Sequence, residues 1–119
     1  MESSADRLDR LDRTFGALAD PARLAVIGLL RKKPLRSSDV ASALSMSRPT
    51  TSRHLQILRR AGLVEEAPVA EDARVRLYQL RPEPFSEMRG WLDDVEAFWK
   101  DQLHSFRAHV EGKYGRRRR

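Results

Sequence analysis

Cysteine is absent from this chain of 119 residues. Its absence excludes disulfide bonds, a thiolate nucleophile, a thiol redox switch and any cysteine-ligated metal. Long hydrophobic runs are missing as well, because no apolar stretch approaches the roughly 18 residues that a membrane helix needs. The N-terminal sequence MESSADRLDRLDR also lacks the apolar segment and cleavage pattern of a secretory signal. We therefore expect a soluble, cytoplasmic protein without a membrane partner.

Recognisable catalytic motifs are missing too. The chain has no Gly-rich phosphate-binding loop, and none of its three histidines has a carboxylate and a nucleophile at a familiar spacing. Adjacent acids, such as Asp93 and Asp94, point in different directions on a helix and are expected to be solvated surface. The sequence thus predicts that the protein is not an enzyme and carries no cofactor.

Acidic residues are missing from one segment in particular, MSRPTTSRHLQILRRAGLV over residues 46–64. This segment holds four arginines and a histidine, whereas residues 83–101 hold six acids against Arg89 and Lys100. The net charge of +6 is weaker evidence, because Arg116 to Arg119 at the C-terminus supply four of the positive charges. Charge that is sorted by segment is typical of a protein with one surface that faces a polyanion.

The length and a hydrophobic fraction of 40% suit a single domain over residues 1–119. A first amphipathic helix, ending near Asp20, is predicted by apolar residues at helical spacing: Leu8, Leu11, Phe15 and Leu18. Asp20 and Pro21 then start a second helix, because aspartate caps free amides and proline needs no amide hydrogen there. This helix, over 21–33, is apolar on most sides and is expected to be buried. The sequence SSDVASAL over 37–44 predicts a short third helix with a serine cap.

A helix-turn-helix pattern is predicted over about 37–62. Three residues, 45–47, form the turn, and a serine cap starts the next helix. Thr51 lies on the inward side of this helix, where its hydroxyl can bond the carbonyl four residues back, and Gly62 can end the helix in the left-handed conformation. The inward residues are Thr51, Leu55 and Leu58, and the opposite face carries Arg48, Thr50, Ser52, Arg53 and His54.

Past Gly62 the hydrophobic period changes. The segments LVEEAPV and RVRLYQL predict an antiparallel hairpin, which forms a wing over about 63–80. Pro82 and Pro84 introduce a long helix over about 82–114, followed by a basic tail over 115–119. This helix has two apolar stripes, so one can pack on the helix-turn-helix core and the other can meet a second copy of the chain. Alternatively, the aromatic stripe recruits a different protein to a DNA-tethered module.

The outward face of residues 48–60 has the chemistry of a DNA-reading helix. Arginine pairs bidentately with guanine, and hydroxyl groups bond base edges or phosphates. Arg74 and Arg76 on the hairpin would contact the neighbouring backbone or minor groove. The competing interpretation is a solvated helix face, but such a face normally mixes charges of both signs at four-residue spacing. We therefore expect double-stranded DNA as the partner.

Three segments resemble the signature blocks of the ArsR/SmtB family of winged helix-turn-helix repressors. They are FGALADPARLAVIGLL, SSDVASALSMSRPTTSRHLQILRRAGLV and RVRLYQL, which fall within residues 14–80. The C-terminal sequence MRGWLDDVEAFWKDQL is similar to a branch of that family that generally lacks metal sites. Two residues depart from the pattern: Ser45 stands where relatives usually have glycine, and Thr51 where they usually have an apolar residue.

The resemblance implies a mainly α fold with a small β-hairpin, a winged helix-turn-helix with N- and C-terminal dimerisation helices. It also implies a bacterial, cytoplasmic homodimer that binds an inverted-repeat operator and represses transcription. The DNA contacts that it implies are Ser47, Arg48, Thr50, Ser52, Arg53 and His54 on the reading helix, with Arg74 and Arg76 on the wing. The dimer interface is expected to comprise Leu8, Leu11, Phe15, Trp91, Val95, Phe98, Trp99, Leu103 and Phe106.

The family's metal sites find no match in this sequence. Arg36 and Ser38 stand where the cysteine pair would be, and arginine cannot ligate a metal. His104 and His109 on the last helix are five residues apart, which is not a same-face spacing. His54 is expected to bond either DNA or its own scaffold. The sequence thus predicts no metal site, and it identifies no effector.

Overall fold

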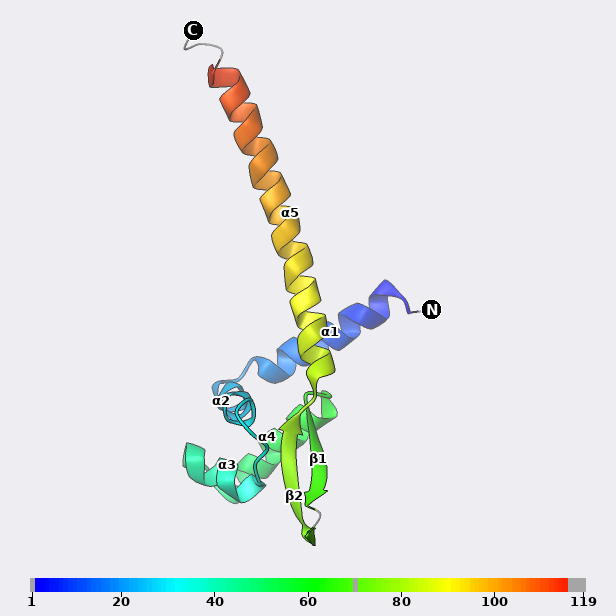
Figure 1. Ribbon diagram of the computed structural model, residues 1–119, viewed down its shortest axis with the longest axis vertical. Helices are drawn as coiled ribbons and strands as arrows, with labels where there is room; N and C mark the ends of the chain where they lie inside the picture. The colour runs from blue at the N-terminus through cyan, green and yellow to red at the C-terminus, as the bar shows by residue number, and fades with distance from the viewer. Residues whose placement is uncertain (1, 70, 116–119) are drawn as a thin grey trace. The chain divides into compact units, whose positions relative to one another are not determined.

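The computed structural model describes residues 2–69 and 71–115. In chain order its elements are α1 (Ser4–Leu18), α2 (Pro21–Leu30), α3 (Ser37–Leu44), α4 (Arg48–Arg60), β1 (Val64–Val69), β2 (Asp72–Leu80) and α5 (Pro82–Gly115) (Figure 1). The predicted mainly α fold with one hairpin is confirmed. The predicted tail residues Arg116 to Arg119 lie outside the described residues. The chain divides after Glu87 into two units, which are described separately.

Side-chain caps start three of the first four helices. Ser3 and Asp6 form a reciprocal capping box at α1, with 3.2 Å between the Asp6 amide and Ser3 Oγ. Asp20 caps α2 by accepting from the amides of Ala22 and Arg23, and these bonds hold the pKa of its carboxyl below the ordinary value. Ser47 caps α4. The caps predicted at Asp20 and Ser47 are therefore confirmed.

Two predicted details of α2 and α3 are wrong. The serine cap of α3 is absent: Arg36 occupies the cap position without a side-chain cap hydrogen bond, and Ser37 is already helical. Helix α2 ends at Leu30, and its outer side is open, since Leu24 is exposed. Helix α2 packs on α1, α3, α4 and β2, and these contacts leave Leu24 exposed in the described part of the chain.

The first unit is built around one apolar core. Thr51 is fully buried in this core. Its hydroxyl donates a hydrogen bond to the backbone carbonyl oxygen of Ser47 at 2.8 Å, as predicted. Gly62 ends α4 with φ of 82°, which confirms the predicted left-handed position. The core residues are Ala17, Val26, Leu30, Val40, Leu55, Leu58, Leu63 and Val64.

The hairpin is anchored at its base on both sides. Strands β1 and β2 pair antiparallel from Val64 with Leu80 to Pro68 with Arg76, and the register becomes irregular at Val69. The loop before α3 joins the same sheet, because Leu35 and Tyr78 exchange two backbone hydrogen bonds of 3.1 and 2.8 Å. The wing is therefore fixed to the helix-turn-helix through its own backbone.

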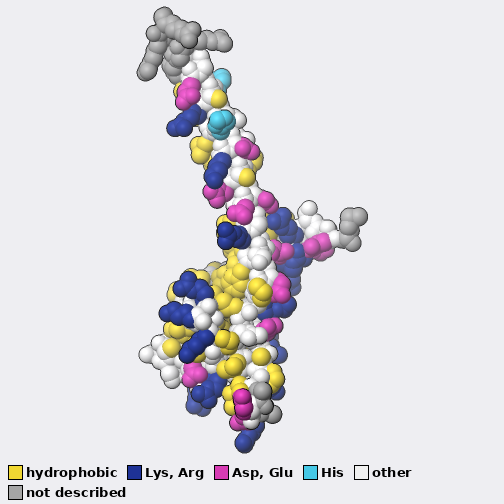
Figure 2. Space-filling model, in the orientation of Figure 1, with side chains coloured by type: hydrophobic (Ala, Val, Ile, Leu, Met, Phe, Trp, Pro, Cys, Tyr) yellow, Lys and Arg dark blue, Asp and Glu magenta, His cyan; other side chains and the backbone are white. Residues whose placement is uncertain are grey.

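Helix α5 starts in the first unit and continues through the second. Its exposed side chains after Met88 include many large apolar ones, and Figure 2 shows hydrophobic side chains among charged ones along this helix. Ion pairs between Lys100 and Glu96 and between Arg107 and Glu111 are spaced four residues apart and support the helix. Among the described residues, no helix has the length and apolar content to cross a membrane.

The turn between α3 and α4 carries a strained residue. Ser45 has φ of 53°, the left-handed conformation that costs an ordinary L-residue about 1–2 kcal/mol. We expect Ser45→Gly to raise the free energy of unfolding by roughly 0.5–1 kcal/mol, because part of the relief is lost to the greater freedom of unfolded glycine. Urea denaturation at fixed protein concentration measures this change.

Gly62→Ala is the matched control for Ser45→Gly. No neighbouring atom would obstruct a Cβ at Gly62, so any loss of stability there comes from the positive φ alone. We expect that variant to be less stable than the parent by about 1 kcal/mol. A destabilised Ser45→Gly variant would show that the serine is not strained in this turn.

Candidate nucleic-acid interface

The start of α4 is held by a compact set of hydroxyl bonds. Ser47 Oγ accepts from the Thr50 amide at 3.3 Å and donates to Thr50 Oγ1 at 2.9 Å. The Thr50 hydroxyl keeps its own hydrogen, so it can still donate outward. Two of the predicted DNA contacts, Ser47 and Thr50, therefore lie together at the beginning of the reading helix, in fixed orientation.

The outward face of α4 presents unpaired cations. Arg48, Ser52 and Arg53 are exposed and Thr50 is half-buried, whereas Thr51, Leu55 and Leu58 face the core. Within residues 2–69 and 71–115, the side chains of Arg48 and Arg53 make no hydrogen bond or ion pair. Their guanidinium groups are thus available to an external anion or base edge.

His54 does not lie on this outward face, and its predicted place there is wrong. Its side chain is buried, with only 8% of the residue exposed, and Nδ1 lies 3.4 Å from Arg23 Nη1. Arg23 in turn donates to the carbonyl oxygen of Ala17. His54 follows Thr51 by three residues and precedes Leu58 by four, so the inward spacing itself could have placed it inside. The alternative that His54 bonds its own scaffold agrees with the structure.

A groove of about 380 Å³ runs between α4, the start of α3 and strand β2. Four arginines line it and no acid does. Arg74 is 94% exposed in its side chain and is only loosely paired with Asp72, at 3.6 Å. Figure 2 shows basic side chains on the part of this unit that carries the free end of the hairpin. The arginines of the groove are Arg36, Arg48, Arg74 and Arg76.

Arg36 is the member of this groove that the sequence did not predict. Arg36 directly precedes α3, and the two residues that follow it, Ser37 and Ser38, also line the groove. Arg36 Nε pairs with Asp39 at 3.3 Å on the exposed surface. The sequence signal that could have found it is an arginine directly before a predicted helix start, where the helix dipole disfavours a cation.

A side-chain network links α4 to the wing beside this groove. Tyr78 donates its hydroxyl hydrogen to Glu66 Oε1 at 2.7 Å, and Arg59 Nη1 lies 3.3 Å from the same oxygen. Burial, followed by the bond to Glu66, raises the pKa of Tyr78 to about 12. The network joins three elements, α4, β1 and β2, and so fixes the wing relative to the reading helix.

The Tyr78 phenol gives a prediction for alkaline pH. Its folded pKa lies above its ordinary value of 10.0, so its contribution to stability is complete below pH 10 and is lost as the pH rises through about 12. Glu66→Gln should lower the Tyr78 pKa only in part, because burial is the larger cause and remains. Ultraviolet absorbance titration of both proteins, with Tyr78→Phe subtracted as the background, measures the shift. An unchanged Tyr78 titration in Glu66→Gln would show that the bond has no such role.

The residues predicted for dimerisation fall into two groups. Leu11 is 3% exposed and packs inside its own chain, so its predicted place in an interface is wrong. The buried residues of α1 are Leu11, Thr14 and Ala17, so only part of the predicted apolar stripe faces inward, and Leu8 and Phe15 are exposed. Trp91 is half-buried, and the remaining predicted residues are exposed in the single chain: Leu8, Phe15, Val95, Phe98, Trp99, Leu103 and Phe106.

The described residues contain no group of three or more His, Asp or Glu side chains that could hold a metal ion. His104 and His109 are both exposed on α5. The candidate site is therefore made mainly of arginines and hydroxyl-bearing residues. They are concentrated at the groove between α3, α4 and β2.

Comparison with known proteins points to one family. Residues 20–66 match the model for bacterial regulatory protein, arsR family. The chain is 33% identical over 102 residues to the HTH-type transcriptional regulator Rv2034 of Mycobacterium tuberculosis, covering 86% of this chain and 90% of that protein.

Solved structures agree with the sequence match. The crystal structure of an ArsR family transcriptional regulator, RHA00566, superimposes with a TM-score of 0.67 at 30% identity, over 84% of this chain and 97% of that one. A second similar structure is the homodimeric winged helix-turn-helix DNA-binding domain Mb0332 from Mycobacterium bovis, with a TM-score of 0.63 at 26% identity. That likeness covers 85% of this chain and 93% of the other.

Proposed function

Since this chain belongs to the arsR family of bacterial regulatory proteins and is a transcriptional regulator with a helix-turn-helix DNA-binding domain, we propose that it is a homodimeric repressor of an inverted-repeat operator. Helix α4 would enter the major groove, and the hairpin would follow the neighbouring backbone as a wing. The same role would place it with the bacterial chromosome in the cytoplasm. The family and its relatives are regulators and not enzymes.

The acid-free groove of four arginines is the observation that carries this proposal. Arg48 and Arg53 on α4 have no partner among the described residues, and Ser47, Thr50 and Ser52 provide hydroxyl groups beside them. Arg74 and Arg76 come from the wing and Arg36 from the start of α3. These arginines of the wing and of the α3 start would contact phosphates on both sides of α4. The side chains of α4 itself would reach base edges.

Two-fold pairing is supported by the exposed apolar side of α5. Its large apolar side chains are exposed in the described part of the chain, and the similar domain from Mycobacterium bovis is homodimeric. A symmetric dimer would present two α4 helices about 34 Å apart, one helical turn of DNA, and would therefore read an inverted repeat.

Selection of bound duplexes from a random pool, followed by fluorescence anisotropy at physiological salt, tests the proposal. We expect a palindromic site that binds at least about 10³-fold more tightly than a shuffled duplex. A duplex with a single half-site is the matched control and should bind much more weakly. Transcription in vitro from a promoter that overlaps the selected site should fall when the protein is added. No sequence preference, or equal binding of one half-site and two, would contradict the proposal.

A further inference from the structure

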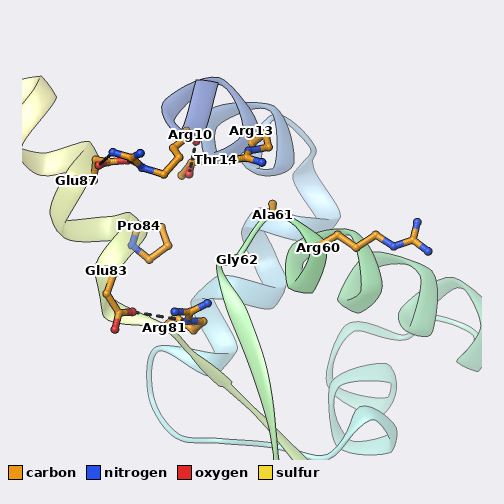
Figure 3. Close-up of a pocket in the computed structure, with 10 residues that line it drawn as sticks. All are labelled: Arg10, Arg13, Thr14, Arg60, Ala61, Gly62, Arg81, Glu83, Pro84 and Glu87. Carbon is orange, nitrogen blue, oxygen red and sulfur yellow. Dashed lines mark hydrogen bonds and ion pairs between the residues drawn. The ribbon is translucent and has the colours of Figure 1, made fainter. Parts of the chain in front are cut away.

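A second cavity, of about 300 Å³, lies between α1, the end of α4 and the start of α5 (Figure 3). It shares no residue with the arginine groove. Its lining combines charged side chains from α1 and from the β2 to α5 junction with the small apolar surfaces of Ala61 and Pro84. All of its lining residues belong to the first unit. Its volume is in the range of small-molecule sites.

The acids of this cavity are already engaged. Glu87 accepts two hydrogen bonds from Arg10, at 3.0 Å from Nε and 2.7 Å from Nη2, and these bonds hold its pKa below the ordinary value. Figure 3 shows this pair side by side along one wall. Glu83 lies 3.7 Å from Arg81 Nε. The acids therefore neutralise Arg10 and partly offset Arg81.

Among the described residues, two arginines that line this cavity, Arg13 and Arg81, make no side-chain hydrogen bond. In the described part of the chain, the Arg13 side chain makes no hydrogen bond or ion pair. Arg81 Nε lies 3.8 Å from Glu65 and 3.7 Å from Glu83, distances of loose ion pairs that are too long for hydrogen bonds. Arg60 also lines the cavity, but Figure 3 shows its guanidinium group directed away from the centre.

We propose that this cavity is a binding site for a small organic dianion, such as a dicarboxylate or a phosphate monoester. Arg13 from α1 and Arg81 from the β2 to α5 junction provide two planar guanidinium groups, each able to hold a carboxylate or phosphate bidentately. Ala61 and Pro84 give the short carbon body of such a ligand an apolar contact. A monoanion would engage only one of the two guanidinium groups.

Calorimetry and amide NMR of the full chain test the site with two probes, succinate and glycerol 3-phosphate, in the absence of DNA. Acetate at equal ionic strength is the monoanion control. We expect saturable binding of at least one dianion, with shifts of the Ala61 and Gly62 amide signals. Binding of succinate alone assigns a dicarboxylate, binding of glycerol 3-phosphate alone assigns a phosphate ester, and binding of both assigns any compact dianion.

Arg13→Gln should weaken that binding by about tenfold or more, since it removes a charge-assisted hydrogen-bonding group. Arg31→Gln is the matched control: it removes an exposed arginine at the end of α2, outside the cavity, and should bind as the parent does. Arg13 is exposed and unpaired, so its replacement should leave the fold intact, which circular dichroism checks. The proposal fails if neither dianion binds saturably, if acetate binds equally well, or if both variants bind alike. Because no DNA is present, such a failure leaves operator binding untouched.

Discussion

Replacing Trp99 with alanine should convert the proposed dimer into monomers without unfolding the chain. Trp99 is 59% exposed in the single chain, so its own protomer depends little on it. The exposed apolar residues at helical spacing from Trp99 include Val95, Leu103 and Phe106. In the proposed dimer, this apolar side of α5 in the second copy would bury the indole. Removing a buried tryptophan costs about 3–5 kcal/mol, which would raise the dimer dissociation constant by two orders of magnitude or more.

Light scattering at micromolar concentration measures the outcome directly. The parent should have about twice the chain mass of 13.7 kDa, and Trp99→Ala should approach the single mass. His104→Ala is the matched control, because five residues at 100° each place it on the other side of α5 from Trp99. A parent that stays monomeric would instead favour the alternative in which the aromatic stripe recruits a different protein.

Arg53→Ala should remove operator recognition while leaving dimerisation intact. The side chain is exposed on the middle of α4 and has no partner among the described residues, so its loss leaves no buried group unsatisfied. If it pairs bidentately with a guanine, the loss of operator affinity is roughly 1–3 kcal/mol and is concentrated at one base position. Binding to duplexes substituted at each position locates that base.

Two variants serve as comparisons for Arg53→Ala. Arg74→Ala on the wing should weaken binding to all sequences alike and lower the log-log salt slope by about 0.9, as expected for a lost phosphate contact. Arg89→Ala, an exposed arginine on α5, should bind as the parent does. Arg53 would be a phosphate contact, and not a reader of bases, if its variant followed the Arg74 pattern.

The regular parts of the fold were predictable because local chemistry determines them. Three examples are the helix start at Asp20 and Pro21, the serine cap at Ser47 and the left-handed Gly62. Each has a physical cause that can be recognised from the residue types alone. Thr51 was also placed correctly, since its hydroxyl has a backbone acceptor at hand within the helix. The hairpin was predictable because the spacing of hydrophobic residues changes after Gly62 from that of a helix to that of strands.

The errors arose where tertiary neighbours decide the outcome. The spacing of His54 from Thr51 and Leu58 is compatible with an inward position, but its partner Arg23 lies 31 residues away in the sequence, and only the folded chain shows that contact. Leu11 was assigned to the dimer because spacing reveals an apolar side without saying what covers it. Arg36 was missed because its neighbours in the groove come from α4 and β2, which only the folded chain brings together.

The way in which the wing is held affects how the DNA sites of such a regulator could change in evolution. The wing is held by the network of Arg59, Glu66 and Tyr78 and by the Leu35 bridge. Helix α4 and the wing are held as one block, so within a protomer the reading of a half-site depends on a few surface side chains. In the proposed dimer, the spacer between half-sites would be set elsewhere, by the pairing of α5 with its counterpart. Under the proposed mode of binding, half-site sequence and spacer length could diverge independently among related regulators, each through substitutions in a different helix.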